Sequence, residues 1–536
     1  METEVSAVPA ASATASYRPY YVEFRGQIEV CSPLHIGAGE DLSLHSDMPI
    51  LRDPESGRPF IPGSSLRGVL RSHLEHERTL LGCSKSVLES LFGHIGPKHH
   101  DDALTFMGRL TVWDALWEDK TQSETCEIRD YVTIDPETGA SARGKKFDAE
   151  SLLRTGARFS FRLIYEGDGE KDRELMLLHE ALDALKEGRL RVGAKSGWGF
   201  GQVCLAPGSL EYRSYQRQET KGLSEFLAMR FPSPEDDGWR QESFPWQNVG
   251  EPLAEPFDPK QPSPLSFLEF DLRVQCEGPV LVKSAIPPLM EPLDEAERGE
   301  LERKLKGDPD RWSEMGLREA DHVFLLSSTD EKPYLPGSSL RGVLRSQALR
   351  ICRSQLTGDE PLEQLFGVQK GDGTGQKGCI EIGDGVLEGE PNYVYLDHVA
   401  IDRITGAAED KKKFSTCGLD SPAFKVKVRL SIAPHQIASA ALFAFLLRDL
   451  MNPGRLWVGS GTSRGYGMVQ QTAIQELHVN LVARDWDGVE GERQQGRVKK
   501  TMKASGPKGL DWDELKWLWE LLDSAWQRVR LREVPA

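Results

Sequence analysis

The sequence predicts an α+β protein built from two tandem ferredoxin-like or RRM-like domains, with insertions and a C-terminal helical tail. The first observation is an internal repeat: the segment Pro62–Ser72 (PGSSLRGVLRS) recurs unchanged at Pro336–Ser346. The second is that each copy shows the order strand, helix, strands, helix, strand, which is the order of a βαββαβ unit. One fold used twice therefore accounts for most of the 536 residues.

Hydrophobic periodicity predicts the individual elements. Val22–Val30 alternates apolar and polar residues, which is typical of a half-buried strand, and Phe159–Tyr165 shows the same pattern later in the copy. The segment after Pro62 has apolar residues three and four apart, which indicates an amphipathic helix. Leu175–Leu185 is a second such helix, and Ile437–Leu447 answers it in the other copy.

The repeats also divide the chain into segments. The two copies end near the glycine-rich loops Gly193–Gly201 and Gly459–Gly467, and a proline-containing stretch without a strand period separates them. In the tail, a basic stretch at Arg493–Lys508 precedes one apolar helix face, expected to dock on this chain or on a neighbour: Trp512, Leu515, Trp519, Leu522 and Trp526. The predicted segments are a disordered leader (1–19), domain 1 (20–212), a linker (213–264), domain 2 (265–477, with an insertion at about 287–319) and the tail (478–536).

Composition limits the class of protein. With 66 Lys+Arg against 83 Asp+Glu, the formal net charge is −17, so any polyanion must be held by local basic patches and not by the overall field. The longest apolar run, Ile437–Leu447, is too short to span a bilayer, which predicts no membrane partner. Eight cysteines without a CxxC pair exclude a disulfide framework and predict a reducing, cytoplasmic location.

The repeated helix carries the first candidate site. A serine at its start is a good N-cap, the first turn offers backbone amides and the positive end of the helix dipole, and two arginines four residues apart share a face. Together these groups predict a phosphate site, although a capped helix with solvated arginines would show the same residues. The candidates are Ser64, Ser65, Arg67 and Arg71 in the first copy and Ser338, Ser339, Arg341 and Arg345 in the second.

The two glycine loops are the second candidate site. Many glycines let a backbone lie against a ligand, Lys195 and Arg464 supply charge, and Trp198, Phe200 and Tyr466 supply faces for stacking. A glycine-rich loop alone is often only a turn. Its recurrence beside the phosphate-type helix in both copies favours binding of a nucleic-acid backbone.

An aspartate before each serine helix is the third candidate. Asp47 and Asp321 each lie sixteen residues before the first glycine of the repeated helix. One carboxylate near an RNA phosphate can bind a divalent cation or orient a 2′-hydroxyl, although an aspartate in a loop is more often a turn former. Cys83 and Cys126, with nearby histidines, leave a zinc site open, but their spacing is irregular and the second copy lacks them.

These residues resemble a known family. Leu34–Gly39, Asp47–Asp53, Pro59–Gly68, Leu91–Gly93 and the glycine loop look like the RAMP superfamily, and more narrowly like backbone subunits of type III CRISPR effector complexes. Two fused copies are similar to the double-backbone subunit of type III-D variant systems. The resemblance covers both domains.

The resemblance implies a function. Each domain would grip CRISPR guide RNA with its serine/arginine helix and glycine loop, and domains would stack with other subunits of the complex. Asp47 and Asp321 would cut complementary target RNA with Mg²⁺ or another divalent cation, beside hairpin thumbs near Asp130–Phe147 and Asp397–Phe414. The lysines expected to meet phosphate on the thumbs are Lys145, Lys146, Lys412 and Lys413.

The second copy departs from the family pattern, and two alternatives stay open. Val282–Ala285 replaces the Ile-Gly-x-Gly loop of the first copy, which makes Asp321 a weaker candidate than Asp47. One alternative is a non-catalytic RNA-binding scaffold. The other is an endoribonuclease that processes the CRISPR precursor, but the His or Tyr/Lys acid–base set which that chemistry needs does not recur in the two copies.

Overall fold

The computed structural model describes residues 18–39, 47–78, 80–95, 105–118, 126–135, 138, 140–152, 156–229, 239–240, 244, 265–283, 322–327, 332–355, 358–369, 375–433, 436–482, 492–494, 497–506, 508–511 and 513–520. Some of the predicted features lie outside the described residues: Asp321, most of the leader and linker, the insertion, and Trp512, Leu522 and Trp526 of the tail.

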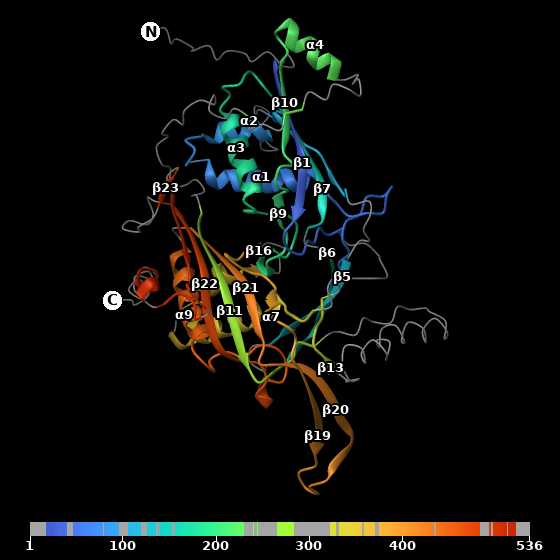
Figure 1. The fold of residues 1–536 in the computed structure, drawn as a ribbon, viewed down its shortest axis with the longest axis vertical. Coiled ribbons are helices and arrows are strands. Elements are labelled where there is room, and N and C mark those ends of the chain that lie inside the picture. Colours follow the sequence, from blue (N-terminus) through green and yellow to red (C-terminus); the bar gives the residue numbers. More distant parts are fainter. Residues whose placement is uncertain are drawn as a thin grey trace, which may run out of the picture.

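Domain 1 is an antiparallel sheet with helices on one face (Figure 1). Its elements are β1 (Tyr20–Val30), β3 (Leu110–Val112), β7 (Arg158–Gly167), β8 (Leu190–Arg191), β9 (Gln202–Leu205), β10 (Glu211–Gln216), α1 (Gly63–Glu77), α2 (Lys85–Phe92) and α3 (Glu174–Lys186). The strand order is β3-β7-β1-β9-β8, and β10 pairs with the first half of β1. The predicted α+β, ferredoxin-like class is confirmed.

Alternating side chains explain how this sheet holds its helices. Along β7, buried and more exposed residues alternate over the whole strand, as the sequence predicts. Phe159 and Leu163 of β7 are completely buried in the same core as Leu74 of α1 and Leu178 of α3. The two helices therefore cover the apolar face that the period-two pattern of the strand creates.

Domain 2 repeats this arrangement with longer strands. Its sheet contains β11 (Ser266–Glu277), β14 (Tyr334–Leu335), β17 (Ile380–Ile382), β18 (Gly385–Leu387), β21 (Ala423–Ile432), β22 (Met468–Val482), β23 (Glu492–Gln494) and β24 (Arg497–Lys503). The strand order is β14-β18-β21-β11-β22-β24-β23, with β17 beside β21. Its helices are α7 (Gly337–Gln355), α8 (Glu360–Phe366) and α9 (Ile437–Met451).

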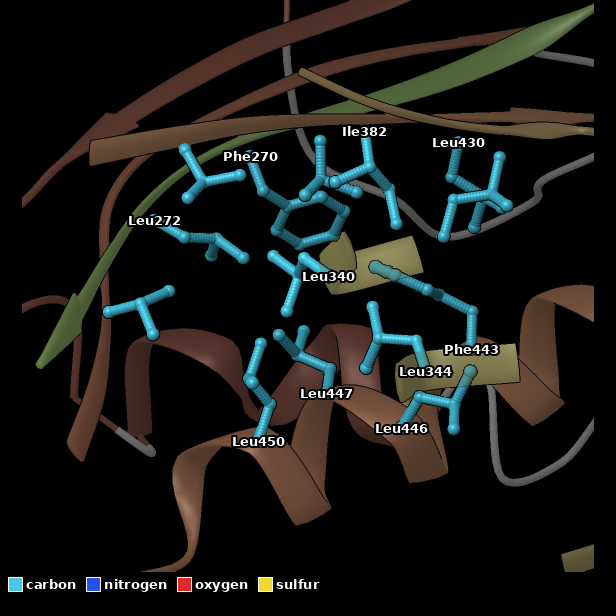
Figure 2. Close-up of a cluster of buried hydrophobic side chains, with 14 of the residues drawn as sticks. Phe270, Leu272, Leu340, Leu344, Ile382, Leu430, Phe443, Leu446, Leu447 and Leu450 are labelled. Carbon is cyan, nitrogen blue, oxygen red and sulfur yellow. The ribbon is translucent and has the colours of Figure 1, made fainter. Parts of the chain in front are cut away.

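Figure 2 shows the core between this sheet and α7 and α9. Phe270 of β11, Leu344 of α7 and Leu447 of α9 are at most 2% exposed. Burying a side chain of this size contributes about 1.5–3 kcal/mol, so the repeated helix is fixed mainly by its apolar face. None of the helices in the described part of the chain, the apolar α9 included, combines the length and hydropathy needed to cross a membrane.

Two long hairpins leave the domains at corresponding places. They are β5 (Cys126–Ile134) with β6 (Ser141–Leu152) in domain 1, and β19 (Tyr393–Ile401) with β20 (Ala408–Asp420) in domain 2. Hairpins therefore occupy both segments where the resemblance implied thumbs, and Figure 1 shows the second one reaching away from the body. The short elements are β2 (Phe60–Ile61), β4 (Ala115–Leu116), β12 (Pro279–Val280), β13 (His322–Val323), β15 (Val368–Gln369), β16 (Gly375–Gln376), α4 (Thr220–Met229) and the 3₁₀ turns η1 (Ser196–Trp198) and η4 (Thr462–Arg464).

The chain between and after the domains is more ordered than the sequence predicts. β10 continues to Gln216, and α4 follows it inside the predicted linker. In domain 2, β22 runs past Leu477 to Val482, and the basic stretch Arg493–Lys508 contains β24, which pairs with the second half of β22. Sequence reasoning did not predict β24, because four of its seven residues are Lys or Arg and a strand is usually recognised by its apolar residues. Lysine-rich strands are typical of sheet edges.

Candidate nucleic-acid interface

The serine/arginine helices begin differently from the prediction. The N-cap position of α1 is Pro62, and no side chain caps the helix from that position, so the prediction that Ser64 or Ser65 is the N-cap is wrong. Both serines lie inside the first turn. Instead, the Gly63 amide donates a hydrogen bond to the Asp114 carboxylate at 2.7 Å. This carboxylate already meets the positive end of the helix, which weakens that end as a phosphate site.

Domain 2 has the same arrangement. The Gly337 amide donates to the Asp384 carboxylate at 2.8 Å. Asp384 also accepts a hydrogen bond from the Arg129 guanidinium of domain 1, again at 2.8 Å. Ser338 and Ser339 follow in the first turn of α7, and both are half-buried, whereas Ser64 is exposed. The helix start of domain 2 is therefore covered by domain 1.

One arginine of each repeated pair is part of the fold. Arg67 donates to the backbone carbonyl of Phe92, and Arg341 donates to the corresponding carbonyl of Phe366. Burial, with repulsion from Arg345, lowers the pKa of Arg341 to about 10, and burial lowers the pKa of Arg67 in the same direction. These guanidiniums hold the end of the next helix.

The second arginine of each pair, Arg71 or Arg345, is more accessible to solvent than a core residue. Arg345 is exposed and Arg71 is half-exposed, and neither has an ion-pair partner among the described residues. The first arginine of each pair thus holds a carbonyl of the fold, whereas Arg71 and Arg345 stand beside the serines Ser72 and Ser346 in the chain.

The glycine loop of domain 1 packs against domain 2. A Cβ added at Gly197 would lie 3.3 Å from the Arg341 guanidinium, and one at Gly199 would overlap the Gly383 Cα. Gly199 has φ +75°, which favours glycine as well. In domain 2 the corresponding Gly465 has φ +85°, and no atom lies within 4 Å of its added Cβ among the described residues. The two loops share one conformation, but only the first is in contact with another domain.

Aromatic side chains join each loop to the base of its thumb. In domain 1, Tyr131 of β5 stacks on Trp198 with ring centroids 4.6 Å apart, and on Phe147 of β6 at 5.2 Å. One face of Trp198 is thus covered. The Lys195 ammonium lies 5.4 Å from the Tyr131 ring, and burial, with repulsion from Arg129, lowers its pKa to about 8.

The thumb base of domain 2 has different residues. His398 stands at the place of Tyr131, stacks on Phe414 at 4.7 Å, and shares a hydrogen bond of 3.1 Å with the Tyr466 hydroxyl. Arg464 lies over Phe414 at 5.4 Å. The expectation that Phe200 and Tyr466 present stacking faces is wrong, because both are buried.

The aspartate segments lead toward the thumbs, through isolated β-bridges in domain 1 and through the short strand β13 in domain 2. Asp47 is exposed, and Ile50, three residues later, forms a β-bridge with Gly37. Arg52 then donates a hydrogen bond of 3.5 Å to the Cys126 sulfur at the start of β5. In domain 2, β13 runs parallel to β20 of the thumb. The residue before β13 is Asp321, which lies outside the described residues.

The remaining predicted residues lie on the thumbs or show no metal site. Lys412 pairs with Glu409, and Lys413 lies 3.8 Å from Asp397; both lysines are exposed. Lys145 and Lys146 belong to β6, but their side chains lie outside the described part. Cys83 and Cys126 are free thiols, and within the described residues no group of three or more His, Cys, Asp or Glu side chains is placed to hold a metal.

The fold and this site define a repeated α+β domain that carries a hairpin and a glycine loop in each copy, and comparison with known proteins identifies the family. The sequence matches the RAMP superfamily over residues 27–204 and again over residues 273–470. The chain therefore belongs to that superfamily, with two domains of it in tandem.

Named relatives place it among CRISPR proteins. It is 26% identical over 198 residues to the CRISPR system Cms endoribonuclease Csm3 of Streptococcus thermophilus, covering 34% of this chain and 86% of the relative. The Csm3 of Methanothermobacter thermautotrophicus is 30% identical over 230 residues, covering 38% of this chain and 93% of the relative. The CRISPR system Cmr endoribonuclease Cmr4 of Pyrococcus furiosus is 36% identical over 84 residues, covering 16% and 26%. The first two alignments each span about one domain of this chain.

Sequence reasoning missed Asp114, Asp384 and Arg129. Each aspartate lies two residues after the end of a short strand of its copy, β3 or β17, so aligning the two copies over this region would have pointed to them. Arg129 gave no signal of this kind, because its partner belongs to the other domain.

We expect Gly199→Ala to separate the two domains and Gly465→Ala to leave them docked. Both changes place an alanine at positive φ, at a cost of about 1 kcal/mol. Only the first drives a methyl group into the backbone of Gly383. Small-angle scattering should show a larger radius of gyration for Gly199→Ala alone; equal radii for the two variants would contradict the described interface.

The pKa of Lys195 predicts a pH-dependent stability. Its folded pKa of about 8 lies below the ordinary value of 10.5, so between these values the unfolded chain binds more protons and stability rises with pH. Lys195→Met should therefore be more stable than the wild type at about pH 7.5, and the difference should shrink by about pH 10. Urea unfolding at both pH values measures this. The exposed Lys221→Met is the control, and a stability difference between Lys195→Met and the wild type that stays constant with pH would be inconsistent with burial of the ammonium.

Proposed function

We propose that this chain is a backbone subunit of a type III CRISPR effector complex. It binds guide RNA along both domains and cleaves complementary target RNA beside each thumb, with Mg²⁺ or another divalent cation. The observation that carries this proposal is the head-to-tail packing of two RAMP domains. In domain 1 the segment after Asp47 contacts the start of the thumb through Arg52, and in domain 2 the strand β13 pairs with the thumb. Repeated domains in one direction suit a ligand that is itself a repeating polymer.

The proposed guide contacts are local cations on a chain of net charge −17. Arg71 and Arg345 occupy the same position on α1 and α7, beside serine hydroxyls, and Lys412 and Lys413 lie on a thumb. Guanidiniums suit phosphate oxygens because they donate two hydrogen bonds in one plane. Phosphates bound in succession along the two helices would follow the direction of the stack.

The proposed cleavage uses Asp47, and Asp321 in domain 2. Mg²⁺ is commonly held by one or two carboxylates together with substrate phosphates and water, so a single exposed aspartate beside the thumb fits such an ion once RNA is bound. A bound cation would polarise a phosphoryl oxygen. Asp47 would hold the cation against the phosphate that the thumb displaces, and the two domains would thus give two separate cuts.

The double variant Arg71→Glu with Arg345→Glu should weaken guide binding. Losing two phosphate contacts should reduce the slope of log affinity against log salt by about 2. Lys186→Glu with Lys221→Glu changes the net charge equally at exposed positions away from the two arginines, and it serves as the matched control. Filter binding over a salt series measures both; identical slopes for the two variants would remove the phosphate assignment.

Asp47→Ala should abolish one set of target cuts in the assembled complex and leave target binding unchanged. Asp321→Ala should abolish the other set. Asp53→Asn is the control, because Asp53 follows on the same segment but is bonded to Ser56 in a turn. The readout is the product ladder of an end-labelled target.

The same ladder separates the alternative functions. Cleavage that survives the double aspartate variant would support a scaffold whose neighbour cuts the target. Cutting of precursor RNA by the isolated chain without metal would support a processing enzyme instead.

A further inference from the structure

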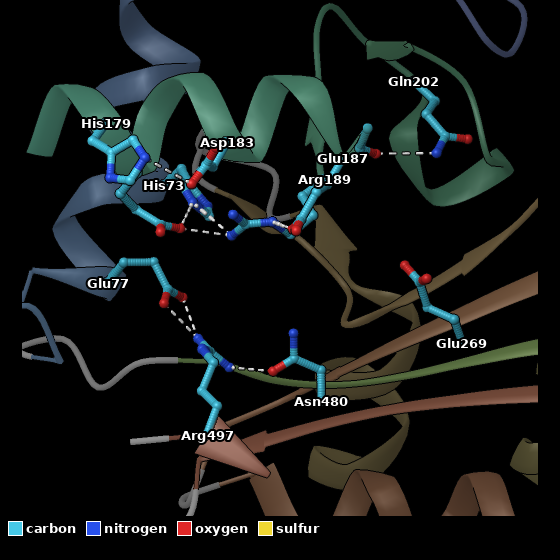
Figure 3. Close-up of polar contacts among 12 residues, drawn as sticks. His73, Glu77, His179, Asp183, Glu187, Arg189, Gln202, Glu269, Asn480 and Arg497 are labelled. Atoms are coloured by element: carbon cyan, nitrogen blue, oxygen red, sulfur yellow. Dashed lines mark hydrogen bonds and ion pairs between the residues drawn. The ribbon is translucent and has the colours of Figure 1, made fainter. Parts of the chain in front are cut away.

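The two domains carry grooves at corresponding places, and domain 2 itself fills the first one. In domain 1 the groove lies between α1 and α3, with Glu77 on one side and Arg189 on the other. Arg497 of β24 enters it and forms an ion pair with Glu77, in which its Nη2 atom lies 2.5 Å from each carboxylate oxygen (Figure 3). Asn480 of β22 holds the same guanidinium at 3.0 Å. A cavity of about 110 Å³ remains.

The corresponding groove of domain 2 lies between α7 and α9. It is lined by Arg350, Arg448 and Arg455 among others, and its volume is about 540 Å³. Arg448 pairs with Asp449 at 2.8 Å. Arg350 and Arg455 are exposed, and neither of them forms an ion pair with another described residue.

The repeat aligns the two grooves residue by residue. Arg455 stands at the place of Arg189, since each lies three residues before the valine that precedes the glycine loop. Counting from the identical helix segments, Ile351 stands at the place of Glu77. The acid that receives Arg497 in domain 1 is therefore absent from its corresponding position in domain 2.

The charge of the groove is also reversed. In domain 1 the side chains that line it include Glu77, Glu180, Asp183 and Glu187 against Arg189, besides the entering Arg497 and Lys499. In domain 2 they include three arginines against Asp449. An arginine suits the first groove, and a carboxylate suits the second.

We propose that the groove between α7 and α9 is the docking site for a carboxylate on a strand of a different protein subunit, which follows domain 2 as domain 2 follows domain 1. This inference rests on the proposed function, because it needs a stack that continues. A protein side chain is favoured over an RNA phosphate because the same place in domain 1 holds one. A different protein is favoured over a second copy because, where domain 2 has β23 and β24 after its last core strand, domain 1 has α4.

The test is zero-length cross-linking in the complex assembled on guide RNA with its other subunits. Arg350→Lys and Arg455→Lys each place an amine in the groove, and a carbodiimide activates a carboxylate in contact with it. The amine then attacks the activated carbonyl and displaces the urea, which leaves an amide bond. Arg497→Lys is the positive control, since its amine should link to Glu77 within the chain.

The expected result is a peptide in which the amine introduced by Arg350→Lys or Arg455→Lys is joined to an Asp or Glu of another subunit. Three results would overturn the proposal while the Arg497→Lys control links to Glu77: no link, a link to Asp449 only, or a link to an isotopically distinguished second copy of this chain.

A charge-reversed variant separates this inference from the proposed function. Arg350→Glu with Arg455→Glu should reduce incorporation of the cross-linked subunit by roughly tenfold or more, because like charges would then face each other, and leave guide affinity of the isolated chain unchanged. A fall in guide affinity with unchanged subunit composition would assign the groove to RNA instead. Failure of the proposed function would appear separately, as loss of guide binding by the unmodified chain or an unaltered product ladder in the aspartate variants.

Discussion

The arrangement of the two domains depends on Asp384. One of its carboxylate oxygens accepts the first amide of α7, and the other accepts the Arg129 guanidinium at the base of the first thumb. A single side chain thus links the start of the repeated helix of domain 2 to the thumb of domain 1 across the interface. Removing one partner of a buried ion pair typically costs about 3–5 kcal/mol, because the other charge stays buried. Arg129 is only 9% exposed and Asp384 16%.

This contact explains why two identical eleven-residue segments have different surroundings. The start of α7 is buried under the glycine loop of domain 1, whereas Ser64 at the start of α1 is exposed. An interface that joins two different faces of one fold leaves one copy of each face without a partner in the chain. Such a head-to-tail interface can add further domains until a different surface closes the stack. The loop at Gly465 and the groove between α7 and α9 are the two parts of domain 2 that correspond to the docked face of domain 1.

The sequence could predict the fold because its signals are local and repeated. Alternation in β7, apolar spacing in α1 and the identical segments all describe contacts within one element or one copy. Sequence reasoning failed at the helix start, because the acceptor for Gly63 is Asp114, which lies between β3 and β4, 51 residues further along the chain. It failed again for the stacking faces of Phe200 and Tyr466, which are buried in the core, and it did not foresee that Arg67 donates to a backbone carbonyl. A residue type that suits phosphate or bases equally suits a carbonyl or a core.

The contacts between the domains show how an acidic chain, of net charge −17, uses part of its basic residues. Arg129, Arg191 and Arg497 all hold carboxylates of the other domain, so much of the basic content stabilises protein contacts. Arg71 and Arg345, the proposed phosphate contacts of the repeated helices, lie one in each domain. Electrostatic affinity for a nucleic acid grows with the number of phosphates neutralised. One chain therefore offers a short row of contacts, and a stack that continues this row gains affinity with each added domain, which links guide binding to assembly.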